Sequence, residues 1–150
     1  MDYRIIEFEE RHIAGIVEIE NQCFSSPWTE EEIREASENP VYRFLVAECE
    51  DTAGYIGVIE ICGEAYITNI AVLPGYRGNG IGRALLKAAV DGAQSRNCDF
   101  ITLEVRESNS VAIELYKSLG FTEAGKRRNF YTKPDEDAII YTLTFRKESR

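Results

Sequence analysis

Residues 72–86 read VLPGYRGNGIGRALL, and this stretch decides more about the fold than any other part of the chain. The apolar run that leads into it, residues 67–73, is typical of a strand that ends at Pro74-Gly75. Four glycines then fall within eight residues, and apolar residues at helical spacing follow at once. Glycine lets backbone N–H groups surround an anion, and a helix N-terminus adds unpaired donors and the positive end of its dipole. The stretch therefore predicts a pyrophosphate cradle between a strand and a helix.

This cradle differs from two common nucleotide-binding loops. No Lys-Ser or Lys-Thr pair opens the helix, as a P-loop requires for phosphate and magnesium. The glycine spacing departs from G-x-G-x-x-G, and the segment lies in mid-chain without the first βαβ unit of a dinucleotide-binding domain. A tight turn that happens to be rich in glycine stays open as the structural alternative.

Size and charge bound the class of protein. One hundred and fifty residues suit a single domain, 1–150, with a sizeable core. The net charge of −9 argues against direct contact with nucleic acid, which needs a concentrated basic surface, and is compatible with a basic substrate. No apolar run approaches the roughly twenty residues of a membrane span. The N-terminus lacks the pattern of a signal peptide, so we expect a cytoplasmic protein without membrane contact.

The cysteines and the histidine argue against a metal centre and against the familiar nucleophile arrangements. Cys23, Cys49, Cys62 and Cys98 are far apart and no ligand pair has zinc spacing, so we expect small buried hydrophobes and no metal. The one histidine, His12, lies near the start of an amphipathic helix and is expected to be structural. Ser-His and Cys-His arrangements are thereby removed, and a catalytic base would be a carboxylate, a water or a less familiar group.

Hydrophobic periodicity and turn signals predict an α/β (α+β) chain with the order βααβββαβαββ and a single mixed central sheet flanked by helices. A capping box at Thr29 and Glu32 starts the second helix, and Asn39-Pro40 ends it. The strands between 44 and 73 are expected to form an antiparallel meander, with a turn at 51–54. Strand 65–73, helix 80–96 and strand 99–105 are expected to form a right-handed parallel crossover. The other expected strands are 3–8, 121–127 and 138–145, and the other expected helices are 10–24 and 109–119.

The glycine stretch resembles the acetyl-CoA loop of the GNAT acetyltransferases, Arg/Gln-x-x-Gly-x-Gly/Ala, here at 77–82. The predicted element order matches the GNAT fold, so the resemblance covers essentially the whole chain. Four segments resemble more closely the RimI group of ribosomal-protein-alanine N-acetyltransferases: CFSSPWT at 23–29, NIAV at 69–72, LEVRESN at 103–109 and RRNFY at 127–131. In the last segment Phe130 stands where a tyrosine is often found. The resemblance implies transfer from acetyl-CoA, the cosubstrate, to a protein N-terminus. The implied acceptor is the N-terminal alanine of small-subunit ribosomal protein eighteen, a basic partner.

The resemblance also implies the contacts to acetyl-CoA. They fall on Ile70, Ala71, Val72, Gly78, Asn79, Gly80, Ile81, Gly82, Arg83, Asn109 and Tyr116. The backbone of 70–72 would hydrogen-bond the pantetheine arm as an added strand does, and one of its N–H groups would polarise the thioester carbonyl. Asn109 is expected to cap the helix that follows it as well, because the cap uses only its side-chain oxygen.

Two side chains are candidate catalytic residues. Glu104 lies near the C-terminal end of an apolar strand, where a carboxylate can accept a proton directly or through water. The residues alone slightly favour a glutamate paired with Arg106 or another surface charge, whereas the resemblance implies the proton acceptor. Periodicity alone makes Tyr116 a core aromatic, whereas the resemblance implies that it protonates the leaving thiolate. A weak base suffices for an α-amine, whose pKa is near 7.7–8.0, against about 10.4 for lysine.

Two other functions stay open at this point. The chain could acetylate a small-molecule amine, since the acetyl-CoA loop is common to such enzymes, or bind acetyl-CoA as a sensor without catalysis. The pairing of Glu104 with Tyr116 argues against a sensor, because binding requires neither. Trp28 is expected over the substrate groove or in a hydrophobic staple. The glutamates of 30–38 are expected to form a solvated helix face that could steer a basic peptide.

Overall fold

The computed structural model describes residues 2–146, and its strands form one mixed sheet in the order β1-β2-β3-β4-β5-β7-β6. The strands are β1 (Arg4–Glu7), β2 (Tyr42–Glu48), β3 (Thr52–Ile61), β4 (Glu64–Val72), β5 (Phe100–Arg106), β6 (Thr122–Tyr131) and β7 (Glu136–Thr144). The helices are α1 (Ile13–Cys23), α2 (Glu30–Glu38), α3 (Ile81–Ser95) and α4 (Ser110–Ser118), with 3-10 turns η1 (Glu10–His12) and η2 (Pro74–Tyr76). The predicted mixed sheet and element order are confirmed. The single domain over 1–150 stays a prediction.

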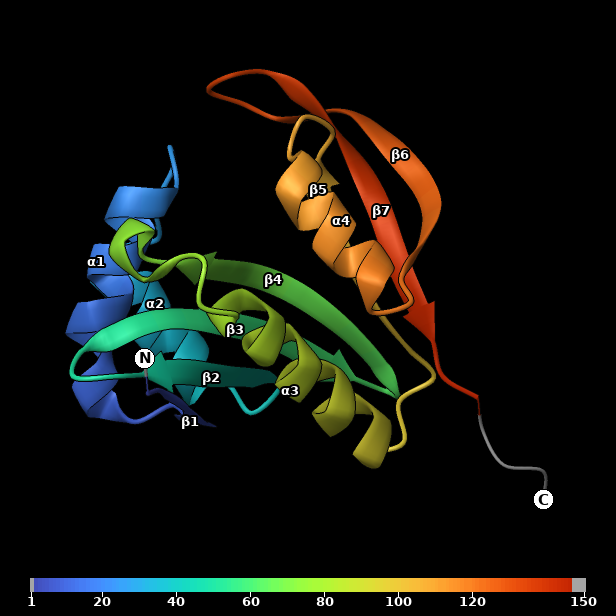
Figure 1. Ribbon diagram of the computed structural model, residues 1–150. Coiled ribbons are helices and arrows are strands. Elements are labelled where there is room, and N and C mark those ends of the chain that lie inside the picture. Colours follow the sequence, from blue (N-terminus) through green and yellow to red (C-terminus); the bar gives the residue numbers. More distant parts are fainter. Residues whose placement is uncertain (1, 147–150) are drawn as a thin grey trace.

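The sheet divides between β4 and β5. These two strands run parallel, as predicted, and pair only where Glu64–Tyr66 lies beside Phe100–Thr102. Beyond these three residue pairs the strands diverge, so β1–β4 and β5–β7 form the two arms of a V (Figure 1). The divergence leaves the far end of β4 without a neighbour on its β5 side.

A bulge in β4 accompanies this divergence. Gly57 of β3 pairs with Asn69 and Val58 pairs with Ile67, so Thr68 is an extra residue on β4. A bulge bends its strand and re-aims the side chains beside it. Gly57 is needed here, because a Cβ at that position would lie 2.8 Å from the Phe44 ring and 2.9 Å from the Thr68 hydroxyl.

Helices cover both faces of the sheet (Figure 1). On one face α1 and α2 bury a core that includes Ile16, Ile19 and Ile33. On the other face α3 and α4 bury Leu85 and Tyr116 against the central strands, among other residues. The core under α1 and α2 lies on the β1–β4 arm, whereas the core under α3 and α4 includes strand residues of both arms.

Capping signals in the sequence operate as predicted. The Thr29 hydroxyl accepts the N–H of Glu32, and the Glu32 carboxylate accepts the N–H of Thr29, so the capping box is present. The side chain of Asn109 accepts the N–H of Ala112 at the start of α4. His12 is buried, with Nδ1 accepting the N–H of Glu9 and Nε2 bonded to Glu48, which is the structural role expected for it.

Several boundaries differ from the expectations. β3 begins at Thr52, so the predicted turn at 51–54 is too long, and β6 continues to Tyr131 rather than ending at Arg127. The charged run at 126–128 conceals this extension, because no apolar alternation marks it. The first turn of the predicted helix 10–24 is a 3-10 turn. Of the cysteines, Cys98 is buried, but Cys62 is exposed at the turn before β4, so the expectation of burial is wrong there.

Two absences concern residues 2–146 alone. None of the helices there combines the length and apolar character needed to cross a bilayer. Within the same range, no three His, Cys, Asp or Glu side chains gather in a group that could hold a metal ion.

Candidate active site

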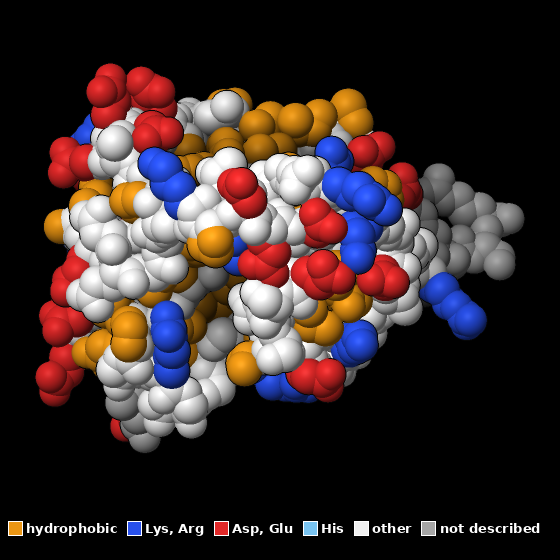
Figure 2. Space-filling view, turned by 90° about the horizontal axis from the view of Figure 1, so that it is seen from above, with side chains coloured by type: hydrophobic (Ala, Val, Ile, Leu, Met, Phe, Trp, Pro, Cys, Tyr) orange, Lys and Arg blue, Asp and Glu red, His pale blue; other side chains and the backbone are white. Residues whose placement is uncertain are grey.

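A cavity of about 600 Å³ lies where β4 and β5 diverge. Its lining comes from β4 (67–70), β5 (103–106), the segment 23–28 that leads from the end of α1 towards α2, and the end of the β6–β7 hairpin (130–134). Figure 2 looks down on this end of the molecule and shows hydrophobic side chains within a hollow, with charged side chains around it. Glu104, Tyr116 and Asn109 line the same cavity, so the structure brings these predicted site residues together.

Glu104 is held on the cavity wall by one ion pair and one hydrogen bond. Arg127 Nε lies 3.1 Å from its Oε1 in an ion pair, and the Tyr66 hydroxyl donates to its Oε2. Only 7% of the Glu104 side chain is exposed. Glu104 therefore makes an ion pair, as the interpretation of a charge-paired glutamate predicted. The partner of Glu104 is Arg127 of β6 and not Arg106. Arg106 turns instead to the β6–β7 hairpin.

Tyrosines near Glu104 stay protonated at neutral pH. Burial raises the pKa of Tyr66, and the hydrogen bond to Glu104 raises it further. Burial also raises the pKa of Tyr131 to about 12, with the charge of Glu104 as a second cause. No motif in the sequence assigns a role to Tyr66. Tyr66 lies opposite Thr102 and therefore diagonal to Glu104. This register could have assigned Tyr66 to the site, but only if the pairing of β4 with β5 had been known.

Tyr116 combines a buried ring with a place on the cavity wall. The ring packs against Phe121 and Tyr141, as expected of a core aromatic, and only 4% of the residue is exposed. Burial raises the pKa of its hydroxyl, with the charge of Tyr131 adding to the effect. A hydroxyl with a raised pKa remains a donor at neutral pH. It gives a thiolate a hydrogen bond more readily than a full proton, because the thiol pKa is near 8.5.

The open edge of β4 offers backbone groups to a ligand. The N–H of Leu73 bonds to the carbonyl of Ala53 on β3, and antiparallel pairing alternates from residue to residue. The backbone groups of Val72 and Ile70 therefore point the other way, into the gap, while those of Ala71 point towards β3. On the gap side, Arg77 Nε already donates to the Val72 carbonyl at 3.0 Å. An open strand edge suits a ligand with an extended, amide-containing arm.

The glycine loop has the conformation expected of a cradle. Gly78 and Gly80 have φ values of 82° and 79°, a left-handed backbone that L side chains rarely adopt. A Cβ at Gly78 would meet no other atom within 4 Å, so the space beside its backbone is open. Arg83, in the first turn of α3, donates to the Ser118 hydroxyl at 2.8 Å. Donors and open space here fit a pyrophosphate at the helix start.

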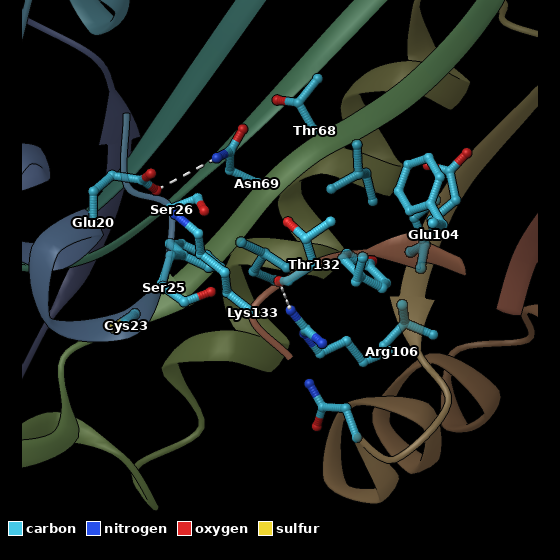
Figure 3. A pocket seen from close by; sticks show the side chains of 18 of the residues that line it. Glu20, Cys23, Ser25, Ser26, Thr68, Asn69, Glu104, Arg106, Thr132 and Lys133 are labelled. Carbon is cyan, nitrogen blue, oxygen red and sulfur yellow. Dashed lines mark hydrogen bonds between the residues drawn. The ribbon is translucent and has the colours of Figure 1, made fainter. Parts of the chain in front are cut away.

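A buried carboxylate forms the opposite wall. Glu20, at 1% exposure, accepts the N–H of Trp28 at 2.9 Å, the hydroxyl of Tyr55 at 2.5 Å and the amide of Asn69 at 3.4 Å. Figure 3 shows Glu20 and Asn69 joined on one side of the cavity, across from Glu104 and Arg106. Glu20 has the helical spacing of a core position, but that spacing gave no reason to expect a charged group there.

Trp28 and Cys23 lie beside this wall. Trp28 lines the cavity and packs edge-on against Tyr42, with 6.2 Å between ring centroids, so a place in the groove and a packing role coexist. Cys23 also lines the cavity, although no motif in the sequence predicted this, and its thiol donates to the Val72 carbonyl at 3.6 Å. The glutamates of α2 are exposed, as expected of a solvated helix face.

The family model described as Acetyltransferase (GNAT) family matches residues 13–121. The chain belongs to the GNAT acetyltransferase family. It is therefore an acetyl-CoA-dependent N-acetyltransferase, and acetyl-CoA is its cosubstrate. The open edge of β4 and the left-handed glycines provide a seat of the kind such a cosubstrate requires.

The similar proteins are more specific than the family. The chain is 37% identical, over 93% of its length and 95% of the relative's, to the [Ribosomal protein bS18]-alanine N-acetyltransferase of Escherichia coli strain K12. A Bacillus subtilis relative, provisionally named for the same activity, is 41% identical over 88% of this chain and 89% of its own length. The crystal structure of the Escherichia coli ribosomal-protein-S18-alanine N-acetyltransferase superposes with a TM-score of 0.90 at 34% identity, covering 99% of this chain and 97% of that one. The predicted resemblance to the RimI group is confirmed.

One more distant GNAT structure bears on the fold. Arabidopsis thaliana NAA60 in complex with acetyl-CoA superposes with a TM-score of 0.87 at 16% identity, over 95% of this chain and 98% of that one. The shared architecture therefore extends to chains that differ at most positions. The individual contacts predicted for residues 70, 72, 78–83, 109 and 116 stay predictions.

Proposed function

We propose that this protein transfers the acetyl group of acetyl-CoA to the α-amino group of the N-terminal alanine of ribosomal protein bS18. The observation that carries the proposal is the meeting of Glu104 and Tyr116 in one cavity beside the open edge of β4. The names of the relatives at 37–41% identity support the choice of acceptor. A ribosomal substrate supports a cytoplasmic location for the proposed reaction.

The cosubstrate would lie along the gap between the arms of the V. Backbone groups of Ile70 and Val72 would hold the pantetheine arm, whereas the predicted backbone contact of Ala71 is excluded because its groups point towards β3. The N–H groups of 78–83 at the start of α3 would hold the pyrophosphate. Asn109, whose oxygen caps α4, retains its amide N–H groups for the same arm. Acetyl-CoA supplies the activated thioester, and the steps below concern what the protein's own residues do.

Glu104 would act on the acceptor amine. The carboxylate takes a proton from the incoming α-ammonium, directly or through a water, and leaves the nitrogen lone pair free to attack the thioester carbon. At pH 7 this deprotonation costs roughly 1 kcal/mol for an α-amine and about 4–5 kcal/mol for a lysine side chain. A single carboxylate held among tyrosines suits the first acceptor better than the second.

Tyr116 would act on the leaving group. As the carbon–nitrogen bond forms and the carbon–sulfur bond breaks, negative charge moves first to the carbonyl oxygen and then to sulfur. A backbone N–H on the β4 edge would stabilise the oxygen, and the Tyr116 hydroxyl would donate to the sulfur. Transfer would be direct, within a ternary complex of protein, acetyl-CoA and peptide.

The test uses a peptide with the N-terminal sequence of bS18 and acetyl-CoA, read by mass spectrometry. We expect one acetyl group on the N-terminal alanine. The same peptide blocked at its N-terminus, with an internal lysine, is expected to stay unmodified. Acetylation of that lysine at a comparable rate, or a preference for small amines such as polyamines, would overturn the proposal.

A further inference from the structure

We infer that Arg106 is a positioning residue that fixes one wall of the acceptor cavity, the hairpin wall formed by residues 131–136. The inference deepens the proposed function and rests on it. Tyr131, Thr132, Lys133 and Pro134 of this wall line the cavity. Arg106 lies on β5, two residues after Glu104, so the same strand carries the proposed base and the residue that holds this wall.

The hydrogen bonds of the Arg106 guanidinium go to the hairpin wall. Nη1 donates to the carbonyl of Pro134 at 2.9 Å and to Glu136 Oε1 at 3.3 Å, and Nη2 donates to the carbonyl of Thr132 at 3.0 Å. The guanidinium carbon also lies 4.5 Å from the centroid of the Tyr131 ring. Figure 3 shows the bond to Thr132 running from β5 across to the hairpin. The planar fork of arginine allows these acceptors to be served together.

The hairpin wall depends on these bonds because its own strands pair poorly at this end. Between Arg127 and Tyr131 the register of β6 on β7 is irregular, and Tyr131 opposite Glu136 is the last pair before the turn. Lys133 adopts a left-handed φ of 55°, which costs energy in a non-glycine residue. Buried backbone carbonyls need hydrogen-bond donors. Arg106 supplies donors to the carbonyls of Thr132 and Pro134, which the pairing of β6 with β7 does not.

Glu136 connects the wall to α4 without needing Arg106. Its Oε2 accepts the N–H of Ser108 at 2.5 Å, next to the Asn109 cap, while its Oε1 accepts from Arg106. If Arg106 is replaced, the bond between Glu136 and Ser108 stays available to hold the start of α4. Loss of Arg106 should therefore loosen the acceptor side of the site and leave the cosubstrate side in place.

This division predicts a specific kinetic signature. Opening of the hairpin wall lowers the fraction of protein competent to bind peptide, and the apparent affinity falls by the same factor. For Arg106→Met we expect the KM for the bS18 peptide to rise about tenfold, as for a loss of about 1.4 kcal/mol, with kcat changed less than about twofold. The dissociation constant of acetyl-CoA should not change. Arg106→Lys keeps the charge beside Glu136 but lacks the fork, so it should give an intermediate KM.

The matched control is Arg96→Met. Arg96 also makes a two-pronged ion pair, to Glu60 at 2.6 and 2.7 Å, but neither residue lines the cavity. It should lose similar stability with no change in KM. Hydrogen exchange supplies a second readout that needs no activity, because the amides of 131–133, 135 and 136 should lose protection in Arg106→Met and keep it in Arg96→Met.

The outcomes separate the two proposals. If the wild-type protein does not acetylate the peptide, the proposed function fails. Hydrogen exchange alone then decides whether Arg106 holds the hairpin wall. Unchanged KM together with unchanged exchange in Arg106→Met would overturn the inference. Equal effects in both variants, or a parallel loss of acetyl-CoA affinity, would also overturn it, because Arg106 would then act only through overall stability.

Discussion

Replacing Glu104 by glutamine removes the proposed base and leaves the shape of the site nearly intact. The amide oxygen of glutamine can still face Arg127, and its amide nitrogen can donate to the Tyr66 oxygen. Arg127 is 56% exposed, so its lost charge partner should change stability by about 0–1 kcal/mol at most. A fall in rate would then report on chemistry rather than on unfolding.

The size of the loss follows from what the carboxylate is asked to do. General-base assistance contributes roughly 10²–10⁴-fold, so turnover of Glu104→Gln at pH 7 should fall by that factor. The variant can use only acceptor that is already neutral. For an α-amine with a pKa near 7.8, the neutral fraction rises from about 14% at pH 7 to about 94% at pH 9, a gain of about sevenfold. High pH should therefore rescue the variant partly and by no more than this factor.

The assay is a pH–rate profile with one N-terminal peptide under single-turnover conditions. Tyr116→Phe should also be slow, but amine deprotonation should not rescue it, because its defect lies in thiolate departure. Glu107→Gln is the matched control, a nearby carboxylate paired with Lys126 at the surface, and should behave as wild type. If Glu104→Gln keeps near-normal turnover at pH 7 while chemistry limits the rate, Glu104 is not the base and its bond to Arg127 is structural.

Three further changes test other parts of the structure. Gly80→Val forces a β-branched residue into a φ of 79° and should weaken acetyl-CoA binding in a folded protein, and unchanged affinity by calorimetry would refute the cradle. Hydrogen bonds from Arg11, Arg4 and His12 lower the pKa of Glu48 from 4.5 to about 2, so the stability it contributes is complete above pH 4.5 and declines as the pH falls towards 2. Glu48→Gln should flatten that acid decline in thermal melts, and an identical slope would contradict the assignment. Glu20→Ala orphans the buried donors on its carboxylate and should cost about 2–4 kcal/mol in denaturant unfolding, whereas a loss under about 0.5 kcal/mol would show that water replaces it.

Local signals made the central part of the fold predictable. The glycine loop between strand and helix depends on backbone conformations that glycine alone adopts freely, and Gly78 and Gly80 adopt them. The capping residues Thr29 and Asn109 act within three residues of themselves. Such features can be derived from sequence because their partners are close along the chain.

The partners of Glu104 were not predictable in the same way. Arg106 is the near neighbour in sequence, yet Arg127 makes the ion pair. Arg127 lies opposite Ala138 of β7, and this small side chain leaves room for the guanidinium to reach Glu104 across the intervening strand. The placement of β7 between β5 and β6 is a long-range property of the sheet, and without it neither Arg127 nor Tyr66 can be assigned to the site.

For Glu20, the position in the fold could be predicted from the sequence, but its burial as a charged residue could not. Its position on the inward face of α1 was visible, but an inward glutamate is stable only if distant donors meet it. Those donors come from β3, β4 and the segment before α2, three parts of the chain that the fold brings together. Glutamate is usually exposed, and these tertiary hydrogen bonds allow Glu20 to be buried instead.

The open edge of β4 shapes how this enzyme can diverge. A seat made of peptide N–H and C=O groups is the same whatever side chains Ile70 and Val72 carry, with proline as the exception because it removes the N–H. Because the proposal seats the acetyl donor on these backbone groups, substitutions of Ile70 and Val72 should leave its binding unchanged as long as the backbone of the strand keeps its path. In the proposed acceptor site the side chains of Glu20 and Arg106 hold the walls, so a change there should alter which acceptor the cavity admits. New acceptors can thus be reached from this scaffold by substitution on one side of the cavity, with the donor side left unchanged.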